Sequence, residues 1–294
     1  MTPRTRAILA LLFSVVLGSS SGVLIKLSNW DAMALNGARS LIAAVVVWVY
    51  LRHPTFTWSR AQVGGAIFFA LAITAFVQAT KWTTAANAVF LQFTAPVWVA
   101  LFSIWLLGER PSRSDWLALI AIACGMLLFF SDELTRSGYW GNLLAIFSGM
   151  CMALMLIALR KQKAGSPTET ILLGNLIAAA IGLPFIILGD QPVNPRELSI
   201  IIFMGVFQLG LPFIIVTLAV KQLFALEMML IQTLEPILNP IWVFLFIGER
   251  PAPMALAGAL LVTTAVTVRA IAAARRPGQK QPGLTKPTQN AQPP

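Results

Sequence analysis

Long apolar stretches follow one another along almost the whole chain and are separated by short polar joints. Ten such stretches are predicted, at 7–26, 32–51, 61–80, 85–107, 115–131, 139–159, 170–189, 198–220, 225–247 and 253–273. Each is close to the roughly 20 residues with which a helix crosses a hydrocarbon core about 30 Å thick. The strands of a membrane barrel would instead alternate apolar and polar residues over about ten positions. The pattern therefore predicts an all-α polytopic membrane protein with ten transmembrane helices.

Residues that end helices occupy the joints between these stretches. Proline, glycine and charged side chains gather at 52–54, 108–111, 163–167 and 192–195, as expected for helix termini. No joint is long enough to hold a separate domain. The final segment, 274–294, carries five prolines and almost no large apolar side chain, a composition that predicts a disordered tail.

Composition supports a membrane location and indicates an orientation. Hydrophobic residues make up 57% of the chain and charged residues 11%, against the roughly 25% charged that soluble domains carry. Of the 21 Lys and Arg residues, fifteen fall on the predicted side that holds both termini and five on the other. Because basic residues mark the cytoplasmic side, both termini are predicted to be cytoplasmic. The net charge of +10 then reflects topology rather than a nucleic-acid partner.

The first stretch has an alternative interpretation. Arg4 and Arg6 precede an apolar run that ends in small residues at 18–21, a pattern that a cleaved signal peptide would share. The apolar pattern continues through Ile25, however, and losing this stretch would leave nine helices and break the internal repeat described below. A first transmembrane helix is the favoured interpretation.

Cysteine and histidine are too few for most catalytic or metal chemistry. Cys124 and Cys151 lie in apolar stretches without a Cys or His at ligand spacing, and His53 is the only histidine. The sequence therefore predicts no metal site, no cofactor and no Ser-His catalysis. An integral-membrane enzyme would need clustered aspartates for magnesium, or a Ser/Lys or Asp pair within the spans, and the sequence has neither. It is the less favoured class.

The two halves of the chain repeat one another. A separation of 140 positions aligns 81–111 with 221–251 and gives eight identities in 31 positions. The matches are Lys81/Lys221, Ala85/Ala225, Gln92/Gln232, Pro96/Pro236 and Gly108-Glu109-Arg110-Pro111/Gly248-Glu249-Arg250-Pro251. A separation of 134 positions brings Phe13-Ser14 onto Phe147-Ser148 and Lys26 onto Arg160. Because each half holds an odd number of predicted helices, five, the second half enters the membrane upside down and an inverted repeat results.

The ten helices, the inverted repeat and the Pro-centred helices closing in Gly-Glu-Arg resemble the drug/metabolite transporter superfamily and its EamA-type exporters. The most specific parts are 93–96 with 108–111 and 234–236 with 248–250. The resemblance covers about 7–273 and implies one EamA-like five-helix repeat in 1–131 and a second in 138–273. By overall likeness the chain is most similar to the YddG-type amino-acid exporters, which are associated with aromatic substrates. The direction of transport rests on this resemblance alone.

Polar side chains inside the predicted helices are costly in hydrocarbon, so each is a candidate for a substrate cavity. Gln92 and Gln232 are repeat-related, and Glu235 shares a helix face with Gln232 at about 100° per residue. Glu235 can bind an amine, carry a proton or bond backbone groups freed by the following proline. Interhelical hydrogen bonding is the alternative for each glutamine. The predicted substrate-binding residues are Gln78, Trp82, Gln92, Trp98, Gln208, Gln232 and Glu235, with kinks at Pro96, Pro212 and Pro236.

Two other charges and the tryptophans have simpler explanations. Arg39 is predicted either to reach the outer membrane surface with its long side chain or to bond Ser40 and nearby carbonyls, with a role in the transport pathway as the alternative. Glu227 is predicted to be a solvated charge at a helix end. Most of the nine tryptophans fit interfacial belts, but Trp82 and Trp98 flank the polar part of 85–107. The paired Gly-Glu-Arg-Pro segments are interpreted as salt-bridged helix ends rather than gates.

Together these features predict an inner-membrane exporter of neutral, preferably aromatic or large apolar, amino acids and related small metabolites, working by alternating access. Its expected partners are the amino-acid substrate, the lipid bilayer and, if Glu235 couples transport to a gradient, protons. A passive facilitator would have the same sequence features. A single intramembrane arginine is too little for phosphorylated substrates such as nucleotide sugars. A drug or other-metabolite exporter of the same fold is the alternative function.

Overall fold

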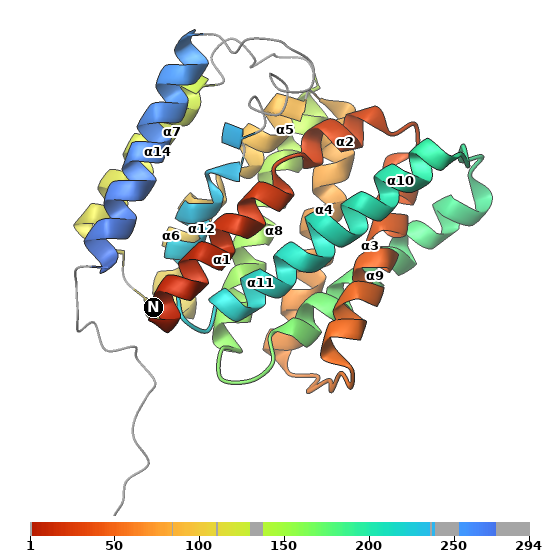
Figure 1. Cartoon of the computed structure of the whole chain (residues 1–294), viewed down its shortest axis with the longest axis horizontal. Helices are drawn as coiled ribbons and strands as arrows, with labels where there is room; N and C mark the ends of the chain where they lie inside the picture. The colour runs from red at the N-terminus through yellow and green to blue at the C-terminus, as the bar shows by residue number, and fades with distance from the viewer. Residues whose placement is uncertain are drawn as a thin grey trace, which may run out of the picture.

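The computed structural model describes residues 2–83, 85–109, 111–129, 138–235, 237–238 and 253–274, which form an all-α bundle (Figure 1). The first half contains α1 (Pro3–Gly18), α2 (Ser21–Leu27), α3 (Ala32–Leu51), α4 (Arg60–Trp82), α5 (Ala85–Gln92), α6 (Ala95–Leu106) and α7 (Arg113–Phe129). The second half contains α8 (Tyr139–Lys161), α9 (Thr168–Leu188), α10 (Pro195–Phe203), the π-helix η1 (Met204–Gly210), α11 (Leu211–Ala219), α12 (Ala225–Gln232) and α14 (Pro253–Ala274). Within these ranges seven segments are long and apolar enough to cross a membrane. The chain is a multi-pass, all-α membrane protein, as predicted.

Short polar side chains fix where several helices begin. The side chains of Thr2, Asp31, Ser59 and Asn194 each accept a hydrogen bond from a backbone N–H in the first turn of α1, α3, α4 and α10, respectively. Such N-caps satisfy donors that have no partner within the helix. Where a capping residue stands at the end of an apolar stretch, the predicted and observed helix limits agree closely. For example, α3 was predicted at 32–51 and spans Ala32–Leu51.

Four of the predicted helices are interrupted in the structure. The first is broken at Ser19–Ser20 between α1 and α2, the fourth at Phe93–Thr94 between α5 and α6, and the ninth at Thr233–Leu234 after α12. The eighth changes to π-helical hydrogen bonding over Met204–Gly210 between α10 and α11. The sequence predicted kinks at Pro96 and Pro212, and it predicted kinks or close helix contacts from the small residues at 19–22. Prolines therefore account for only some of the places where the membrane helices are interrupted.

Helices α3 and α9 cross at two glycines. A Cβ atom added to Gly37 would lie 2.7 Å from the Gly182 Cα, and one added to Gly182 would lie 2.5 Å from the Gly37 Cα. Only glycine allows backbones to approach so closely, and small residues are the usual interface of membrane helices. The crossing holds the repeat-related second and seventh spans in direct backbone contact.

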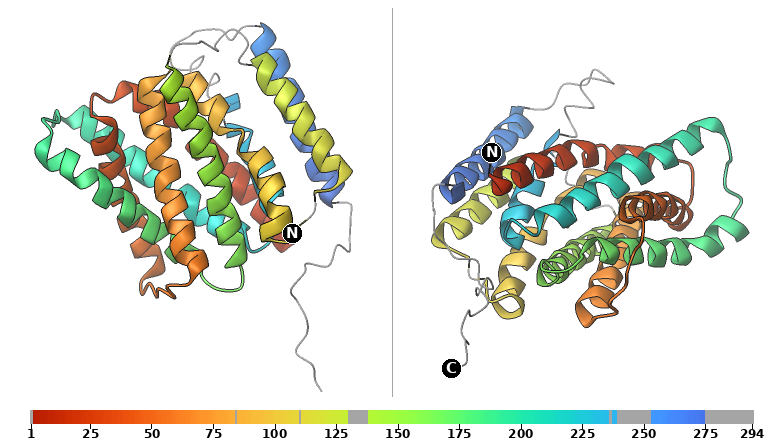
Figure 2. Two further views of the ribbon diagram at one scale, coloured as in Figure 1. Left: turned by 180° about the vertical axis from the view of Figure 1, so that it is seen from behind. Right: turned by 60° about the horizontal axis from the view of Figure 1, so that its bottom comes forward.

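Helices α7 and α14 lie side by side at one edge of the bundle (Figures 1 and 2). A Cβ on Gly125 of α7 would meet Val262 Cγ2 at 2.7 Å and the Gly258 carbonyl oxygen at 3.0 Å. Val262 and Val266 of α14 are buried in the same apolar cluster as Ile122 and Met126 of α7. The last helix of each half therefore packs on its counterpart from the other half.

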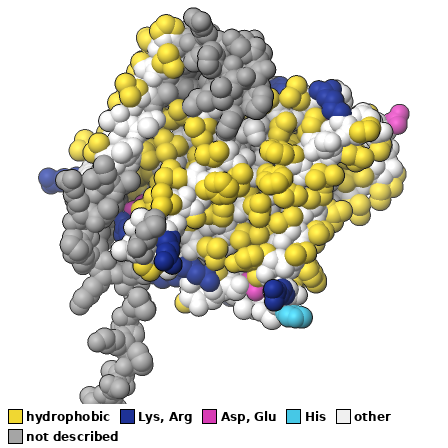
Figure 3. Space-filling model, viewed as in Figure 1, with side chains coloured by type: hydrophobic (Ala, Val, Ile, Leu, Met, Phe, Trp, Pro, Cys, Tyr) yellow, Lys and Arg dark blue, Asp and Glu magenta, His cyan; other side chains and the backbone are white. Residues whose placement is uncertain are grey.

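The outer surface is apolar over a wide area, as a lipid-facing surface requires. Figure 3 shows hydrophobic side chains spread over the face formed by α1, α10 and α11, with Lys and Arg at its margins. Residues such as Phe13, Ile202 and Leu218 are among the large side chains exposed there. A water-soluble monomer would not expose a continuous apolar surface of this extent.

Several sequence predictions fall outside the described residues. These are the kink at Pro236, the second Gly-Glu-Arg-Pro segment at 248–251 and the tail after Ala274.

Candidate functional site

A cavity of about 100 Å³ lies among the interrupted helices near the middle of the bundle. Most of its lining is apolar, with aromatic rings from Phe76, Phe93 and Phe213. Its polar lining residues are Ser14, Ser21, Arg39, Gln92, Gln208, Gln232 and Glu235. Small-molecule sites generally combine an apolar lining with a few convergent polar groups. This cavity is the candidate substrate site.

The helix interruptions converge on this cavity, and hydroxyl groups stabilise three of them. Ser19, Thr94 and Thr233 each donate a hydrogen bond to a carbonyl three residues earlier, at 2.8, 2.8 and 2.5 Å. These bonds satisfy carbonyls that lose their helical partner, as side chains near helix ends do. Irregular backbone at membrane depth is tolerated where it lines a cavity, and transporter sites are commonly built this way.

Each of the three cavity glutamines stands four residues before a proline: Gln92 before Pro96, Gln208 before Pro212 and Gln232 before Pro236. A helical proline lacks the N–H that would bond the carbonyl four residues earlier and its ring crowds that carbonyl. The spacing therefore frees the backbone oxygen of the glutamine itself. This Gln-x-x-x-Pro pattern occurs at all three cavity glutamines. It is a sequence signal that could have located the site.

Gln92 and Gln232 both line the cavity but differ in their partners. The Gln92 side chain donates to Ser148 Oγ of α8 at 2.8 Å, which is interhelical bonding of the kind expected for membrane glutamines. In the part of the chain that the structure describes, the Gln232 amide has no hydrogen-bond partner. The repeat-related glutamines are therefore not equivalent in this conformation.

Gln208 lies on η1 and is 6% exposed. Its Nε2 donates to Ser20 Oγ at 2.7 Å, at the break between α1 and α2. Among the described residues its Oε1 is buried without a partner. A buried acceptor left unbonded is costly, and π-helical turns often occur at functional sites. Gln208 therefore offers a free acceptor at the cavity wall.

Arg39 is buried rather than at the outer membrane surface. Its Nε and Nη2 donate to Asn36 Oδ1 at 3.3 and 3.1 Å, so its side-chain partner is Asn36 instead of the predicted Ser40. Arg39 is 3% exposed and lines the cavity. Asn36 in turn donates to Thr74 Oγ1 at 2.9 Å. This chain of bonds fixes a positive charge beside the site.

The Glu235 carboxylate reaches the end of α1 through a gap left by a glycine. A Cβ on Gly18 would lie 2.9 Å from Glu235 Oε1 and 3.2 Å from Oε2. Within the described ranges neither Glu235 nor Arg39 has an ion-pair partner. The cavity thus holds one basic and one acidic group that do not neutralise each other by direct contact.

The remaining predicted site residues lie elsewhere. Trp82 is 56% exposed at the end of α4, and Gln78 lies one turn before it. Trp98 Nε1 donates to Thr94 Oγ1 at 3.3 Å, and its ring stacks on Phe102. Neither these three residues nor Pro96 line the cavity in this conformation. The structure brings together Gln92, Gln208, Pro212, Gln232 and Glu235.

The repeat relation extends to the cavity lining. The separation of 140 positions continues through the third and eighth spans, where Gly65/Gly205, Leu71/Leu211 and Ala79/Ala219 are identical. Five repeat-related pairs line the cavity: Ile73/Phe213, Phe76/Val216, Gln92/Gln232, Ala95/Glu235 and, at 134 positions, Gly18/Met152. The cavity therefore lies where the two halves meet. Ser14, Ser21 and Met229 are lining residues that the sequence analysis did not select.

The two halves nevertheless contribute different positions to the lining. Eight lining residues have repeat mates that do not line the cavity. One of them, Phe93, lies at the break between α5 and α6, and its mate is Thr233. The other seven lie on α1, α2, η1, α11 or α12, which we call the cavity side: Ser14, Val15, Ser21, Gln208, Leu209, Pro212 and Met229. Their mates lie on α4, α5 and α8, which with α6 form the closed side. Among these mates Phe69, Ala72, Ser148 and Met155 are at most 1% exposed.

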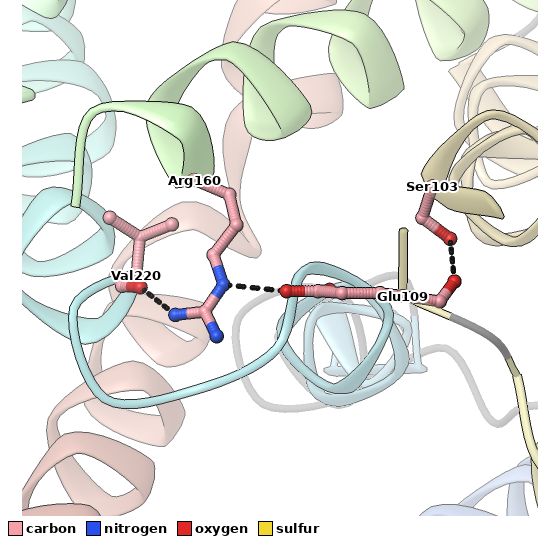
Figure 4. Close-up of polar contacts among 4 residues, drawn as sticks. All are labelled: Ser103, Glu109, Arg160 and Val220. Atoms are coloured by element: carbon pink, nitrogen blue, oxygen red, sulfur yellow. Dashed lines mark hydrogen bonds and ion pairs between the residues drawn. The ribbon is translucent and has the colours of Figure 1, made fainter. Parts of the chain in front are cut away.

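One end of the bundle is closed by a buried clasp, shown in Figure 4. Arg160 of α8 donates through Nε to Glu109 Oε1 at 2.9 Å and through Nη1 to the Val220 carbonyl at 2.7 Å. Its guanidinium also lies 5.1 Å from the centre of the Phe224 ring. The helix end at Glu109, which was predicted to form a salt bridge, forms it with Arg160 of α8. The pKa of Lys163 lies below its usual value, because burial and the nearby Arg160 lower it more than Glu109 raises it.

A second ion pair lies at the same end, between Arg4 of α1 and Glu227 of α12 at 2.6 Å. Glu227 is 4% exposed, so the prediction of a solvated charge is wrong, because the N-terminal turn of α1 covers it. At the opposite end Glu197, also buried, accepts from Ser28 Oγ at 2.7 Å and from Asn29. Polar contacts therefore join residues at each end of the bundle. The residues joined at one end are those that a topology of ten alternating spans places on the same side of the membrane.

Comparisons with known proteins identify the fold and the family. A solved crystal structure matches with a TM-score of 0.79 over 93% of this chain and all of that chain, at 19% identity. The threonine/homoserine exporter RhtA of Escherichia coli K12 is 27% identical over 58% of this chain, and the match spans 57% of that exporter. The pseudopaline exporter CntI of Pseudomonas aeruginosa is 24% identical over 77% of this chain and 82% of that exporter.

These relatives do not support the narrower resemblance to YddG-type aromatic amino-acid exporters. The EamA-like transporter family matches twice, over residues 5–131 and 139–270, so each half carries one copy. Membership of this family also places the chain among transporters rather than enzymes. With two matches that together cover most of its length, the chain belongs to the EamA-like transporter family.

Proposed function

We propose that this protein exports neutral amino acids and similar small zwitterionic metabolites by alternating access. The observation that carries the proposal is the presence of Arg39 and Glu235 in one cavity without an ion pair between them. A zwitterion brings one charge of each sign, so both side chains gain a partner when it binds. Two relatives, a threonine/homoserine exporter and a pseudopaline exporter, support the same class.

The proposed binding mode follows from the chemistry of the lining. The substrate carboxylate pairs with the Arg39 guanidinium, and its ammonium group pairs with Glu235 and the free Oε1 of Gln208. Such charge-assisted hydrogen bonds are worth about 1.5–3 kcal/mol each. The apolar side chain of the substrate then faces Phe76 and Phe213. With Arg39 as the lone cation in the described lining, a phosphate dianion would be poorly neutralised.

The aromatic preference predicted from the sequence receives little support from this lining. The cavity volume of about 100 Å³ is below the roughly 300–1,000 Å³ typical of sites for drug-sized ligands. Trp82 and Trp98, expected to line an aromatic route, lie outside it. We therefore propose that small and medium neutral amino acids are preferred over aromatic ones. An exporter of larger drugs is the rival function and would need a wider cavity.

Counterflow in liposomes containing purified protein tests the substrate class. The panel contains labelled threonine, homoserine, valine, phenylalanine, an uncharged hydrophobic drug and a sugar phosphate. Threonine-sized neutral amino acids should exchange fastest. Exchange of the drug or the sugar phosphate without exchange of any amino acid would refute the proposal, and faster exchange of phenylalanine would restore the aromatic preference.

Two substitutions test the binding mode. Glu235→Gln and Arg39→Met should each lower exchange of neutral amino acids roughly 10- to 100-fold, because each removes one charge-assisted contact. Glu227→Gln, a carboxylate on the same span but outside the cavity, is the matched control for the first. Proton coupling through Glu235 predicts that Glu235→Gln also removes any response to a pH gradient. If Glu235→Gln responds to the pH gradient as the unmodified protein does, then transport is passive or another residue carries the proton.

The proposed orientation places both termini and the loops near Arg60, Arg113 and Lys163 in the cytoplasm, with the protein in the inner membrane. The distribution of basic residues, fifteen against five, supports it. Cysteines introduced singly at residues 60 and 163 should resist an impermeant thiol reagent in intact cells. A cysteine at Asp190, in a loop at the opposite end, should react. Labelling of residue 60 or 163 from outside would reverse the orientation and the direction of transport.

A further inference from the structure

The two halves of the protein contain the same potential hydrogen bond, but only one half forms it. The repeat relates Gln92 to Gln232 and Ser148 to Ser14. On the closed side Gln92 Nε2 donates to Ser148 Oγ at 2.8 Å, and Ser148 Oγ donates to the Ala72 carbonyl at 2.7 Å. This pair joins α5 to α8 and α8 to α4, so it holds three helices of the closed side together.

On the cavity side the equivalent groups are apart. Ser14 and Gln232 both line the cavity, and the Ser14 hydroxyl donates only to the Leu11 carbonyl, at 2.8 Å, among the described residues. The Ser14 oxygen therefore keeps an acceptor site, and the Gln232 amide keeps its donors. The two residues carry the donor and acceptor that Gln92 and Ser148 use in the other half.

Packing explains why one bond is made and the other is not. On the closed side a Cβ on Gly149 would overlap the Gln92 carbonyl oxygen, so α8 and the α5–α6 break touch directly. The residue related to Gly149 is Val15, which lines the cavity instead. The repeat-related helices are thus in direct contact at Gly149 in one half, whereas in the other half Val15 and Gln232 both line the cavity.

We infer that the Gln92–Ser148 and Gln232–Ser14 hydrogen bonds alternate during transport. In the opposite conformation Ser14 bonds Gln232 and closes the present cavity, while Ser148 releases Gln92 and a repeat-related cavity opens beside α4 and α8. The inference rests on the alternating access of the proposed function and is independent of the substrate class. It makes Ser14 and Ser148 positioning residues, since each acts through its glutamine.

The exchange also lowers the cost of the conformational change. Breaking the Gln92–Ser148 bond alone would leave the Gln92 amide without this partner and the Ser148 oxygen with an unused acceptor site, which is unfavourable in a dry interior. Forming an identical bond in the other half restores the number of hydrogen bonds. The two conformations are then close in free energy, as a transporter that cycles between them requires.

Two cysteine reporters distinguish the conformations in substrate-free protein, in a background with Cys124→Ser and Cys151→Ala. Ser21→Cys lines the present cavity and should react with N-ethylmaleimide in this conformation. Ala72→Cys is placed on α4 at 0% exposure, at the position related to the lining residue Pro212, and should react only in the opposite one. The ratio of the two reaction rates reports the equilibrium.

Matched substitutions should shift this ratio in opposite directions. Gln92→Met and Ser148→Ala remove the bond of the present conformation, so they should accelerate Ala72→Cys and slow Ser21→Cys. Gln232→Met and Ser14→Ala remove the bond of the other conformation and should do the reverse. A net hydrogen bond of ordinary strength predicts shifts of roughly two- to tenfold. Ser199→Ala, which loses a bond to the Pro195 carbonyl at an exposed helix end, should leave the ratio unchanged.

A merely structural role would lower stability without moving the two halves in opposite directions. Shifts in the same direction, or none, for the Gln92→Met and Gln232→Met pair would overturn the inference while leaving alternating access intact. An Ala72→Cys reporter that never reacts, even with substrate added, would contradict alternating access itself and overturn both. If one variant of a pair fails to fold, the other removes the same bond and gives the same test.

Discussion

The closed side and the cavity side of the bundle are built from repeat-related helices, yet they have different structures. The closed side contains the long uninterrupted helices α4 and α8, which pack through Gly65, Ala158 and Ser148. On the cavity side the corresponding spans are broken at Ser19–Ser20 and pass through the π-helix η1. Equivalent positions in an inverted repeat can thus be rigid in one half and irregular in the other. This difference between the two sides is the one that the proposed alternation would reverse.

The largest effect that separates the two sides is expected at their ion pairs. Glu109→Met leaves the Arg160 side chain, 1% exposed, without its carboxylate, and breaking a buried pair in this way costs about 3–5 kcal/mol. Glu227→Met leaves Arg4, whose side chain is 35% exposed and can reach water, so its cost is at most about 1 kcal/mol. Thermal unfolding of both purified variants in one detergent measures the difference. Equal unfolding temperatures would remove this distinction between the sides.

A smaller effect is expected where the closed side is tightest. In Gly149→Ala the new methyl group meets the Gln92 carbonyl oxygen and Thr94 Oγ1, and neither the backbone nor a short side chain can move far. Overpacking of this kind costs about 1–3 kcal/mol. The variant should unfold at a lower temperature and favour the conformation in which the closed side opens. Val15→Ala, at the related position on the cavity side, should not favour that conformation.

The cavity side should respond through transport rather than stability. Gly18→Ala brings a methyl group to 2.9 Å from Glu235 Oε1, and the flexible carboxylate can swing away at little cost to folding. The apparent KM for a neutral amino acid should rise roughly tenfold, the equivalent of about 1.4 kcal/mol of a charge-assisted contact. Gly22→Ala is the control, because its methyl group would meet Val89 and Ala85 at ordinary distances of 3.5 and 3.6 Å. A KM change as large in Gly22→Ala would argue against this role of Gly18.

The smallest effect is a gain in stability on the closed side. A methyl group on Gly64 of α4 meets no atom within 4 Å, and alanine is preferred over glycine within a helix by about 0.5–1 kcal/mol. Gly64→Ala should therefore raise the unfolding temperature slightly and leave substrate exchange unchanged. A loss of stability would show that α4 needs conformational freedom at this position.

The sequence predicted the elements well because long apolar runs with polar joints leave few alternatives in a membrane. The limits of α3 and α14 agree with the predicted stretches to within a residue or two. The small residues at 19–22 indicated a kink or a close helix contact, but the sequence did not give the position of the break at Ser19–Ser20, because it depends on partners elsewhere, such as Gln208. Pro96 predicted a kink, but the break lies at Phe93–Thr94, since the proline disturbs the carbonyl four residues before it.

The candidate site could be predicted in part. Repeat symmetry selected Gln92 and Gln232, and mid-span polarity selected Gln208 and Glu235, all of which line the cavity. Trp82 and Trp98 were selected because they flank the polar part of 85–107 in the sequence. In the structure Trp82 ends α4 and Trp98 lies on α6, and closeness in sequence does not determine whether their side chains point into the same cavity. The partners of Arg39 and Glu227, namely Asn36 and Arg4, depend on helix packing that a single sequence does not specify.

The pairing of α7 with α14 also has a consequence for biosynthesis. Each is the last span of its half, and α14 begins about 140 residues after α7 in the chain. At the usual 5–20 residues per second, a nascent chain would hold α7 in the membrane for roughly 7–28 s before its partner is made. During that time the Gly125 surface of α7 faces lipid or the insertion machinery. The first half therefore cannot complete its own packing while it is being synthesised, because α7 gains its partner only when α14 has been translated.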